Sequence, residues 1–140
     1  MAYIWSPLFK TGHEIIDEQH RQLFDALNNI ASAFRKGKGA DEISKTLAFL
    51  VEYTLIHFST EEELMENKKY PKYLAHKKCH DDFKVTAVEL LKKFQEEGPS
   101  EDFIVNVTII IGDWLISHIK IDDIKMVSYI NSTDGFIDIE

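Results

Sequence analysis

The sequence contains few of the residues that end helices or crosslink a chain. Among its 140 residues are one cysteine, three prolines and six glycines. One cysteine cannot form an internal disulfide, which excludes a disulfide-stabilised scaffold and suits a reducing compartment. The prolines and glycines stand mostly between the periodic stretches described below. We therefore expect a soluble, cytoplasmic protein.

Basic residues and long apolar runs are also in short supply. Lys and Arg number 16 against 24 Asp and Glu, which gives a net charge of −8 and no basic stripe for nucleic acid. The longest apolar run, residues 107–111, is interrupted by Gly112 and Asp113, so no membrane span is expected. The N-terminus lacks the charged and apolar regions of a signal peptide. We expect a monomer that binds neither nucleic acid nor membrane.

Four stretches carry apolar residues at steps of three or four, which is the period of an amphipathic helix. The expected elements are an extended arm over 1–16, helices over about 17–37, 41–67, 71–96 and 100–120, and a short helical piece over 124–130. Asp41 and Ser100 are expected to cap the second and fourth helices, and Pro71 to lie in the first turn of the third. Short connections between such helices predict one all-α domain over 1–140, an antiparallel up-down-up-down four-helix bundle.

The inward face of each expected helix follows from its apolar residues. In the second helix this seam is expected to include Leu64, whereas Glu62 and Glu63 rotate away from it and should be solvated. In the fourth helix Ile110 and Ile121 are expected to face the core. These assignments assume regular helices throughout.

Histidines fall on these seams far more often than random placement would give. Five of the six lie on the inward faces of the four helices: His20, His57, His76, His80 and His118. His57 and Glu61 are four residues apart, so both side chains project from one face, one turn apart. A buried ionised Glu is costly when unpaired, and a metal ion is the usual partner when histidines accompany it. In an up-down bundle all these positions lie at the same end, so the sequence predicts one metal site there.

A single histidine on an apolar face is more often a hydrogen-bonded core residue than a ligand, but five on converging seams together with a Glu in register favour a metal site. His13 lies off every seam and is expected to be a surface or capping residue. Cys79 lies between His76 and His80 but off their seam, so we expect no metal or redox role for it.

The number of ligands points to two metal ions. Five imidazoles and two carboxylates exceed the needs of one tetrahedral zinc, which disfavours a zinc-stabilised structural bundle. Two octahedral ions offer twelve positions, of which the histidines fill five, two bridging carboxylates four, and an oxide or hydroxide bridge two. One position then remains, on one ion only, for a small diatomic ligand.

The identity of the second carboxylate is ambiguous from spacing. On a regular helix Asp122 lies ~40° from His118 and Asp123 ~140°. Ideal geometry therefore favours Asp122, and Asp123 could take part only where the helix is distorted or broken.

The order of these residues resembles the hemerythrin family, and in detail its single-domain bacteriohemerythrins. The resemblance rests on His20, then His57-x-x-x-Glu61, then His76-x-x-x-His80, then His118 with Asp123. The local strings at residues 16–20, 57–62, 70–76 and 114–119 are similar too, and the match covers roughly residues 3 to 130. One such pair alone would be weak evidence, whereas seven positions in order are highly specific.

The resemblance implies a non-haem di-iron centre (Fe2+/Fe3+, bridged by oxide or hydroxide) that binds dioxygen reversibly, for carriage, storage or sensing. His76, His80 and His118 would hold one iron, His20 and His57 the other, and Glu61 and Asp123 would bridge them. The family spacing of five selects Asp123, and Asp122 should then face solvent or act as a cap. The side chains that match the apolar oxygen pocket of the family are Leu23, Phe58, Trp114, Leu115 and Ile119.

An enzyme is the alternative to a binding protein. Oxygen-activating di-iron enzymes built on bundles typically use carboxylate-rich ligand sets with Glu-x-x-His pairs. This chain has five histidines, two carboxylates and no such pair on its seams. We therefore expect an oxygen-binding protein without catalytic residues, and keep a di-iron oxidase, peroxidase or nitric oxide scavenger as the alternative.

Overall fold

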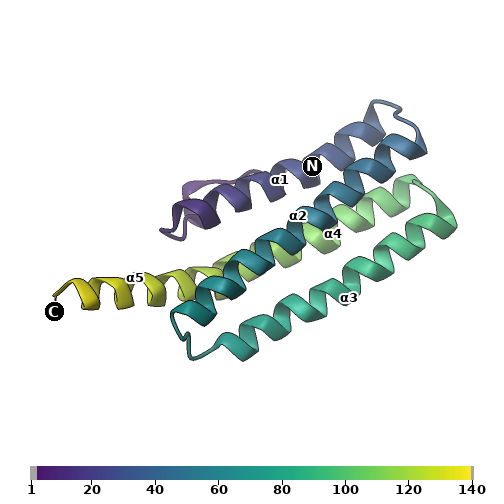
Figure 1. Cartoon of the computed structure of the whole chain (residues 1–140). Coiled ribbons are helices and arrows are strands. Elements are labelled where there is room, and N and C mark those ends of the chain that lie inside the picture. The colour runs from purple at the N-terminus through teal and green to yellow at the C-terminus, as the bar shows by residue number, and fades with distance from the viewer. Residues whose placement is uncertain (1–2, 140) are drawn as a thin grey trace.

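The structure is a bundle of four long helices with a fifth helix extending from one end (Figure 1). The computed structural model describes residues 3–139, and the side chains of residues 3–132. The bundle helices are α1 (Glu14–Arg35), α2 (Ala40–Asn67), α3 (Tyr73–Glu97) and α4 (Glu101–His118). A 3-10 turn, η1 (Pro7–Phe9), precedes them, and the π-helical turn η2 (Ile119–Asp123) and α5 (Ile124–Ile139) follow. No strand occurs among residues 3–139, so the predicted all-α four-helix bundle is confirmed.

Local capping sets two of the helix starts. His13 accepts a hydrogen bond from the backbone N–H of Ile16, so α1 begins at Glu14, slightly earlier than expected, and the extended arm is correspondingly shorter. Ser100 caps α4 as predicted, because its Oγ accepts from the N–H of Phe103 at 3.0 Å.

Two other starts differ from the expectation. Helix α2 begins at Ala40, because the carbonyl of Gly39 already accepts from Glu42 and Ile43, so Asp41 lies in the first turn instead of capping it. Helix α3 begins at Tyr73, whose N–H donates to the carbonyl of Tyr70. Pro71 therefore lies in the turn before α3 and not in its first helical turn.

The main core fills the bundle between α1, α2, α3 and α4. Its buried members include Leu23, Phe24, Leu27, Leu47, Leu50, Phe83, Val107 and Ile111. Two inward assignments were wrong, because Ile110 is 42% exposed beside the buried Ile111 and Ile121 is 54% exposed. Leu64 is half-buried and packs against the smaller cluster described next, to which α2 contributes the buried Met65. Ile121 faces outward because the π turn changes the rotation of the chain after His118.

A second, smaller cluster closes the end of the bundle from which α5 extends, and we call it the end cap. Its buried members are Ile16, Met65, Tyr70, Met126, Val127 and Ile130. Three of the six come from α5, which continues beyond the short helical piece expected at 124–130. Because Ile16 lies one turn before His20 and Met65 one turn after Glu61, the histidines are placed between the main core and the end cap.

The N-terminal arm is tied to the bundle by polar contacts. The backbone N–H and carbonyl of Tyr3 bond the Asn28 side chain at 2.8 and 2.7 Å. Buried Asp17 accepts from the N–H and hydroxyl of Thr11 at 2.8 and 2.7 Å. The Trp5 ring packs against the main core, and the Arg21 guanidinium lies over it, 4.2 Å from the ring centroid.

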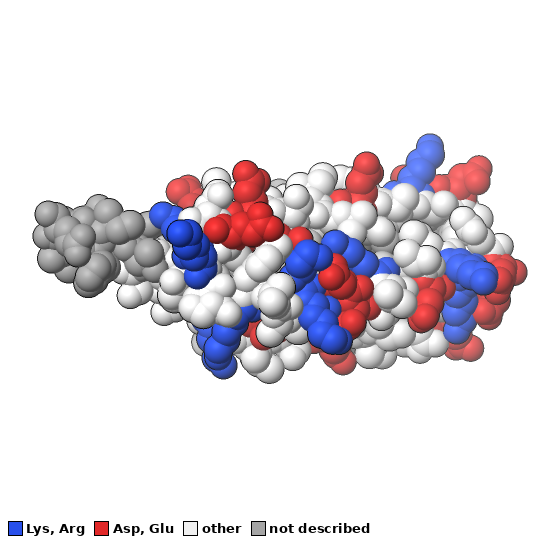
Figure 2. Space-filling model, turned by 60° about the horizontal axis from the view of Figure 1, so that its bottom comes forward, with Lys and Arg blue, Asp and Glu red and all other residues white. Residues whose placement is uncertain are grey.

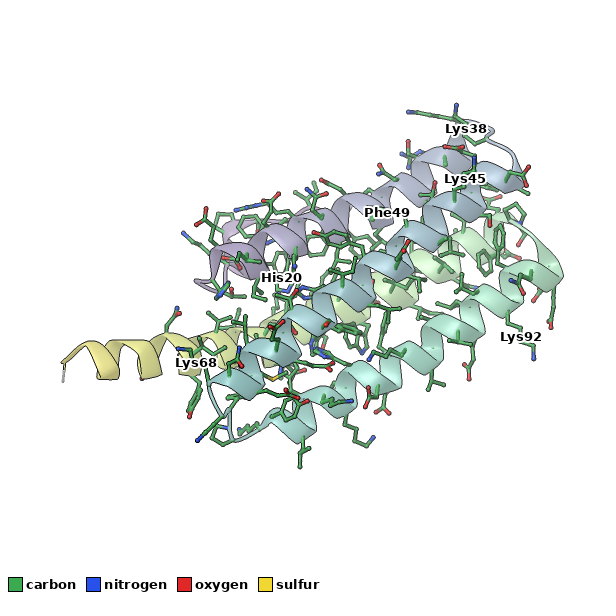
Figure 3. All side chains as sticks on the ribbon, viewed as in Figure 1. His20, Lys38, Lys45, Phe49, Lys68 and Lys92 are labelled. Carbon is green, nitrogen blue, oxygen red and sulfur yellow. The ribbon has the colours of Figure 1, made fainter. Side chains whose placement is uncertain are left out.

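Charges are dispersed over the surface that Figure 2 shows, with acidic and basic side chains interspersed and no basic stripe on that face. Lys77 and Lys78, for example, pair with Asp81 and Asp82 one turn away on α3. In Figure 3 His20 lies at one end of the bundle interior, whereas Lys38 and Lys45 lie at the opposite end.

The helix that begins with α4 continues through η2 into α5, past the end near residue 120 that was expected from the sequence. The segment Glu101–Ser132 is long and apolar enough to cross a membrane by length and composition, because the helix does not stop at Gly112 and Asp113 or at His118. A buried core helix passes the same test, and this segment contributes Val107, Ile111 and Leu115 to the main core.

Candidate metal centre

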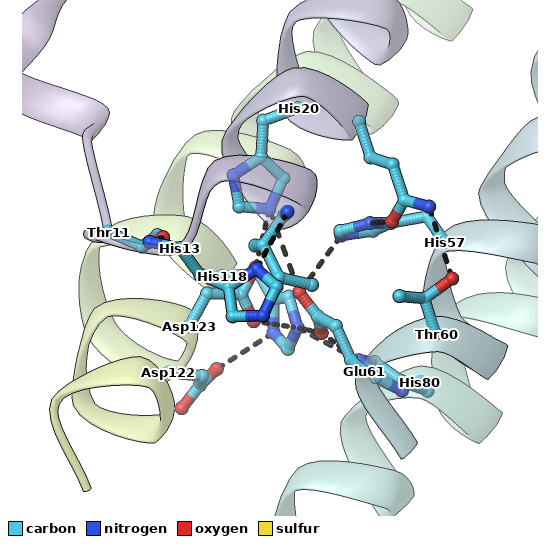
Figure 4. Close-up of polar contacts among 12 residues, drawn as sticks. Thr11, His13, His20, His57, Thr60, Glu61, His80, His118, Asp122 and Asp123 are labelled. Carbon is cyan, nitrogen blue, oxygen red and sulfur yellow. Dashed lines mark hydrogen bonds and ion pairs between the residues drawn. The ribbon is translucent and has the colours of Figure 1, made fainter. Parts of the chain in front are cut away.

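All seven side chains that the sequence singled out converge at one level of the bundle. Figure 4 labels each of them except His76. His20 lies near the start of α1, His57 and Glu61 near the end of α2, and His76 and His80 near the start of α3. His118 ends α4 and Asp123 ends the π turn. Each of the seven is at most 4% exposed. The up-down topology thus brings the histidines together as predicted.

The seven residues form two groups that share both carboxylates. One group is Glu61, His76, His80, His118 and Asp123, and the other is His20, His57, Glu61 and Asp123. Within each group the candidate ligand atoms lie within 4.8 Å of one another. Each group could therefore hold one cation, and both groups include Glu61 and Asp123.

Every histidine directs Nε2 toward the carboxylates. The Nε2 atoms of His57 and His80 lie 2.9 and 3.0 Å from Glu61 oxygens. The Nε2 atoms of His20 and His118 lie 2.9 and 3.0 Å from Asp123 oxygens. His76 Nε2 lies 3.1 Å from an oxygen of each carboxylate.

The π turn decides between the two neighbouring aspartates. Within η2 the N–H of Ile124 donates to the carbonyl of Ile119, five residues back, so one extra residue fits into the turn. This brings Asp123 onto the face of His118, fully buried, with Oδ1 3.0 Å from His118 Nε2. Asp122 instead lies beside the outer nitrogen of His118. The choice of Asp123 over Asp122 depended on such a distortion, and the structure contains one.

Three of the five histidines make a hydrogen bond through Nδ1, the ring nitrogen that faces away from the carboxylates. His57 Nδ1 lies 2.7 Å from Gln19 Oε1, and His118 Nδ1 lies 2.9 Å from Asp122 Oδ2. His80 Nδ1 lies 2.9 Å from Glu62 Oε2, so the expectation that Glu62 is solvated was wrong. Carboxylate and amide oxygens can only accept, so each of these three Nδ1 atoms carries a proton, and in the neutral ring the lone pair is then on Nε2 and directed inward. This is the tautomer that a metal-binding histidine needs.

Sequence reasoning missed these outer partners for identifiable reasons. Asp122 lies four residues after His118, and this spacing does place the two side chains together, but at the outer nitrogen and not in the centre. Glu62 and Gln19 reach histidines on other helices, across the α2–α3 and α1–α2 contacts. Spacing within one helix carries no signal for such contacts.

Hydrogen bonds among the seven residues do not satisfy their buried polar atoms, and this favours a bound cation. His57 Nε2 and Glu61 Oε2 are 2.9 Å apart, yet neither has a hydrogen-bond partner. Asp123 Oδ1 is likewise without one. The Nε2 atoms of His80 and His118 are 3.1 Å apart. If each carries a lone pair, the two nitrogens repel each other unless a cation or a proton lies between them. A set of five imidazoles and two carboxylates suits iron. The same set has more donors than one four-coordinate zinc ion requires.

The protonation equilibria show the same need for positive charge. Burial opposes ionisation of Glu61, but neighbouring His57 and hydrogen bonds from His118 and His20 outweigh it and hold the pKa of Glu61 well below its ordinary value. Burial also disfavours the charged form of His20, yet hydrogen bonds to Asp123 and Glu61 raise its pKa to about 9. The same balance raises the pKa of His76 to about 9. Without a cation, protonated histidines therefore balance the charge of the two buried carboxylates.

The residues matched to the oxygen pocket adjoin the ligands. Phe58 is buried and its ring stacks on His80, with centroids 3.9 Å apart, while half-buried Trp114 stacks on His118 at 4.5 Å. Leu23, Trp114 and Leu115 line a small cavity of about 10 Å³ with Leu50, Thr54, Phe83 and Ile111. The Thr54 hydroxyl already donates to the carbonyl of Leu50 at 2.7 Å. Ile119 is fully buried, so the wall beside the ligands is largely apolar.

His13 lies outside the centre as expected, because it caps α1 and belongs to neither ligand group (Figure 4). Cys79 is half-buried, and its sulfur lies within 4.8 Å of candidate ligand atoms of His118 and Asp122. These three residues form a further group that could hold a metal ion, although Cys79 groups with neither His76 nor His80. The expectation that Cys79 has no metal role therefore stays a prediction.

Comparison with known proteins points to one family. The family model of the hemerythrin HHE cation binding domain matches residues 11–130. The chain is 33% identical to a bacteriohemerythrin of Stenotrophomonas maltophilia over 120 residues, which are 86% of this chain and 76% of that protein. It is 35% identical to a bacteriohemerythrin of Methylococcus capsulatus over 117 residues, covering 81% and 86% of the two chains.

Animal and structural relatives agree with this match. A myohemerythrin of Sipunculus nudus is 32% identical over 123 residues, covering 88% of this chain and 89% of that one. A crystal structure of wild-type hemerythrin superimposes with a TM-score of 0.83 at 30% identity, covering 93% of this chain and 98% of the other. The sequence and the fold therefore both match hemerythrins, over at least 76% of each chain compared.

The raised histidine pKa values determine how the stability of the cation-free protein depends on pH. A histidine whose pKa is higher in the folded state stabilises the fold fully below its unfolded pKa of about 6.5, and this contribution is lost as pH rises toward 9. For His20 and His76 we expect the free energy of unfolding to fall between pH 6.5 and 9, by at most about 1.4 kcal/mol per histidine per pH unit. Urea unfolding in the presence of a chelator measures this, and a flat or rising profile would contradict it.

The two aspartates should differ in their effect on cation binding. We expect Asp123→Asn to reduce Co(II) stoichiometry below two per chain, because a buried shared ligand becomes neutral. Asp122→Asn should retain two ions and weaken binding by about 10- to 100-fold, since it alters only the support of His118. Equilibrium dialysis with metal analysis distinguishes them, and the reverse order would refute the assignment of Asp123.

Proposed function

This chain belongs to the hemerythrin family, and on that premise we propose that it binds dioxygen reversibly at a pair of iron ions. The observation that carries the proposal is the buried layer of five histidines and two shared carboxylates, arranged in two groups. His76, His80 and His118 would hold one ion and His20 and His57 the other, with Glu61 and Asp123 between them. The pair, when bound, supplies the electrons that allow dioxygen to be held and released.

Unequal ligation of the two ions is the reason to expect a vacant position. Three histidines serve one ion and two serve the other, while both carboxylates are shared. With an oxide or hydroxide bridge, one coordination position remains beside His20 and His57. Gln19 orients His57 through Nδ1, so the ring cannot rotate to occupy that space.

The apolar side chains next to the ligands would keep water and protons away from the bound gas. Leu23 lies one turn after His20 on α1, and Leu115 lies one turn before His118 on α4. Both are at most 5% exposed and border the same small cavity. On the other side the end cap excludes solvent with Met65 and Met126, both fully buried. A dry site favours reversible binding over loss of reduced oxygen to solvent.

Binding, and not catalysis, is the function that these residues support best. The centre contains five histidines to two carboxylates, which gives fewer anionic ligands than oxygen-activating di-iron enzymes use. One vacant position leaves no room for a second substrate beside dioxygen. Carriage, storage and sensing of oxygen share this site, and we propose a cytoplasmic role of this kind, consistent with a single cysteine that the fold leaves unpaired.

Anaerobic loading with Fe(II), followed by titration with air, tests the proposal. We expect two irons per chain and a visible absorption band that appears with oxygen and disappears when oxygen is removed, through repeated cycles. Irreversible bleaching, or steady oxygen consumption with an added reductant, would instead identify an oxidase or peroxidase. Failure to retain two irons would refute the proposed centre.

Shortening a side chain in the wall of the pocket should speed autoxidation of the oxygen-bound protein. Leu115→Ala enlarges the cavity beside Leu23 and admits water, so we expect autoxidation to the inactive diferric form to become several-fold faster. The matched control is Ile104→Ala, a buried residue of the same helix that does not line this cavity. Stopped-flow and overnight absorption spectra measure the autoxidation rates. If autoxidation is accelerated equally in both variants, the cause is looser packing of the whole core and not the loss of the pocket wall.

A further inference from the structure

The two halves of the centre differ in the charge behind their histidines. His80 and His118, in the three-histidine half, each bond a carboxylate through Nδ1, supplied by Glu62 and Asp122 at 2.9 Å. His57, in the two-histidine half, bonds the neutral amide of Gln19 at 2.7 Å. The outer partners therefore place two negative charges behind one half and, through Gln19, none behind the other.

The remaining histidine of the two-histidine half strengthens this asymmetry. His20 Nδ1 is buried and has no hydrogen-bond partner among the described residues. The carboxylates behind the other half are only partly solvated, because the side chains of Glu62 and Asp122 are 17% and 33% exposed. Their charges are thus screened less than those of fully exposed acids.

Such a difference has a direct consequence for cation affinity. A carboxylate that accepts from Nδ1–H makes the imidazole a stronger donor and attracts the cation through space, whereas a neutral amide only orients the ring. Changes to such outer partners typically alter metal affinity 10- to 100-fold. Glu61 and Asp123 belong to both halves and cannot produce the difference.

We propose that the two cation positions are unequal: the three-histidine half fills first, and Gln19 is the positioning residue that keeps the two-histidine half the weaker. This inference rests on the ligand assignment of the proposed function. It adds an order of loading, and it makes the half with the vacant position the more labile one.

Anaerobic titration with Co(II) against a competing chelator gives the two stepwise dissociation constants. Hyperfine-shifted Nδ1–H signals show by NMR which histidines are bound. At one equivalent we expect signals from His80 and His118, and the signal from His57 only with the second equivalent. The first step should be at least about tenfold tighter than the second.

Two charge changes of nearly equal shape test the cause. Gln19→Glu should tighten the second step about tenfold with little change in the first, and Glu62→Gln should weaken the first step about tenfold. The matched control is Gln22→Glu, which adds the same charge to an exposed position of the same helix. Thermal melting of the cation-free variants checks folding. If Gln19→Glu does not fold, Glu62→Gln and the order of NMR signals decide.

The inference is overturned if His57 is occupied at the first equivalent, or if Gln19→Glu shifts the second step no more than Gln22→Glu. These measurements use neither iron nor oxygen. Equal steps in a protein that still binds oxygen reversibly would refute the unequal halves alone. Ordered steps in a protein that, with iron, does not bind oxygen would refute the proposed function alone.

Discussion

Two carboxylates, Glu61 and Asp123, lie fully buried at one level of the bundle, and the surrounding structure is arranged to balance their charge. Neither could remain ionised in an apolar interior without close positive partners. Five imidazoles aim Nε2 at them from all four helices and so fix the relative heights of α1 to α4. The same balance suits the layer to cations, because metal ions bound there would supply positive charge that otherwise has to come from protonated histidines.

The π turn is the second requirement, and it links the site to the end of the molecule. By taking one extra residue, η2 turns Asp123 inward and leaves Asp122 to support His118 from outside. It also lets the helix continue into α5, whose Met126 and Val127 complete the end cap (Figure 1). One local distortion thus turns Asp123 into the candidate site, leaves Asp122 bonded to His118, and leads into the helix that covers the end of the bundle.

Much of this could be read from the sequence because helical periodicity is a strong signal. The steps through His57 and Glu61, and through His76 and His80, fixed both the fold class and the facing of the ligands. Asp123 was different, since ideal geometry favoured Asp122 and only the resemblance to a family pointed to the distortion. Ile121 was wrongly placed inward because a regular seam was extended through the π turn, where the rotation of the helix changes.

Residue spacing within one helix could not predict which side chains meet between helices. Glu62 belongs to an acidic run that looks solvated, and only the packing of α3 on α2 brings it to His80. Gln19 likewise reaches His57 because α1 and α2 are adjacent. The cover that α5 provides depends on helix continuation through η2, which no capping or breaking residue signals. These outer contacts govern how strongly each ligand donates, so the chemistry of the centre needs the structure as well as the motif.

The most direct test of the two-ion centre is a crystal structure of the iron-loaded protein with anomalous diffraction measured at the iron absorption edge. We expect two anomalous peaks within the ligand layer, one beside His76, His80 and His118 and the other beside His20 and His57, with Glu61 and Asp123 contacting both. A single peak, or peaks that Asp122 contacts in place of Asp123, would contradict the account of how this bundle holds its metal.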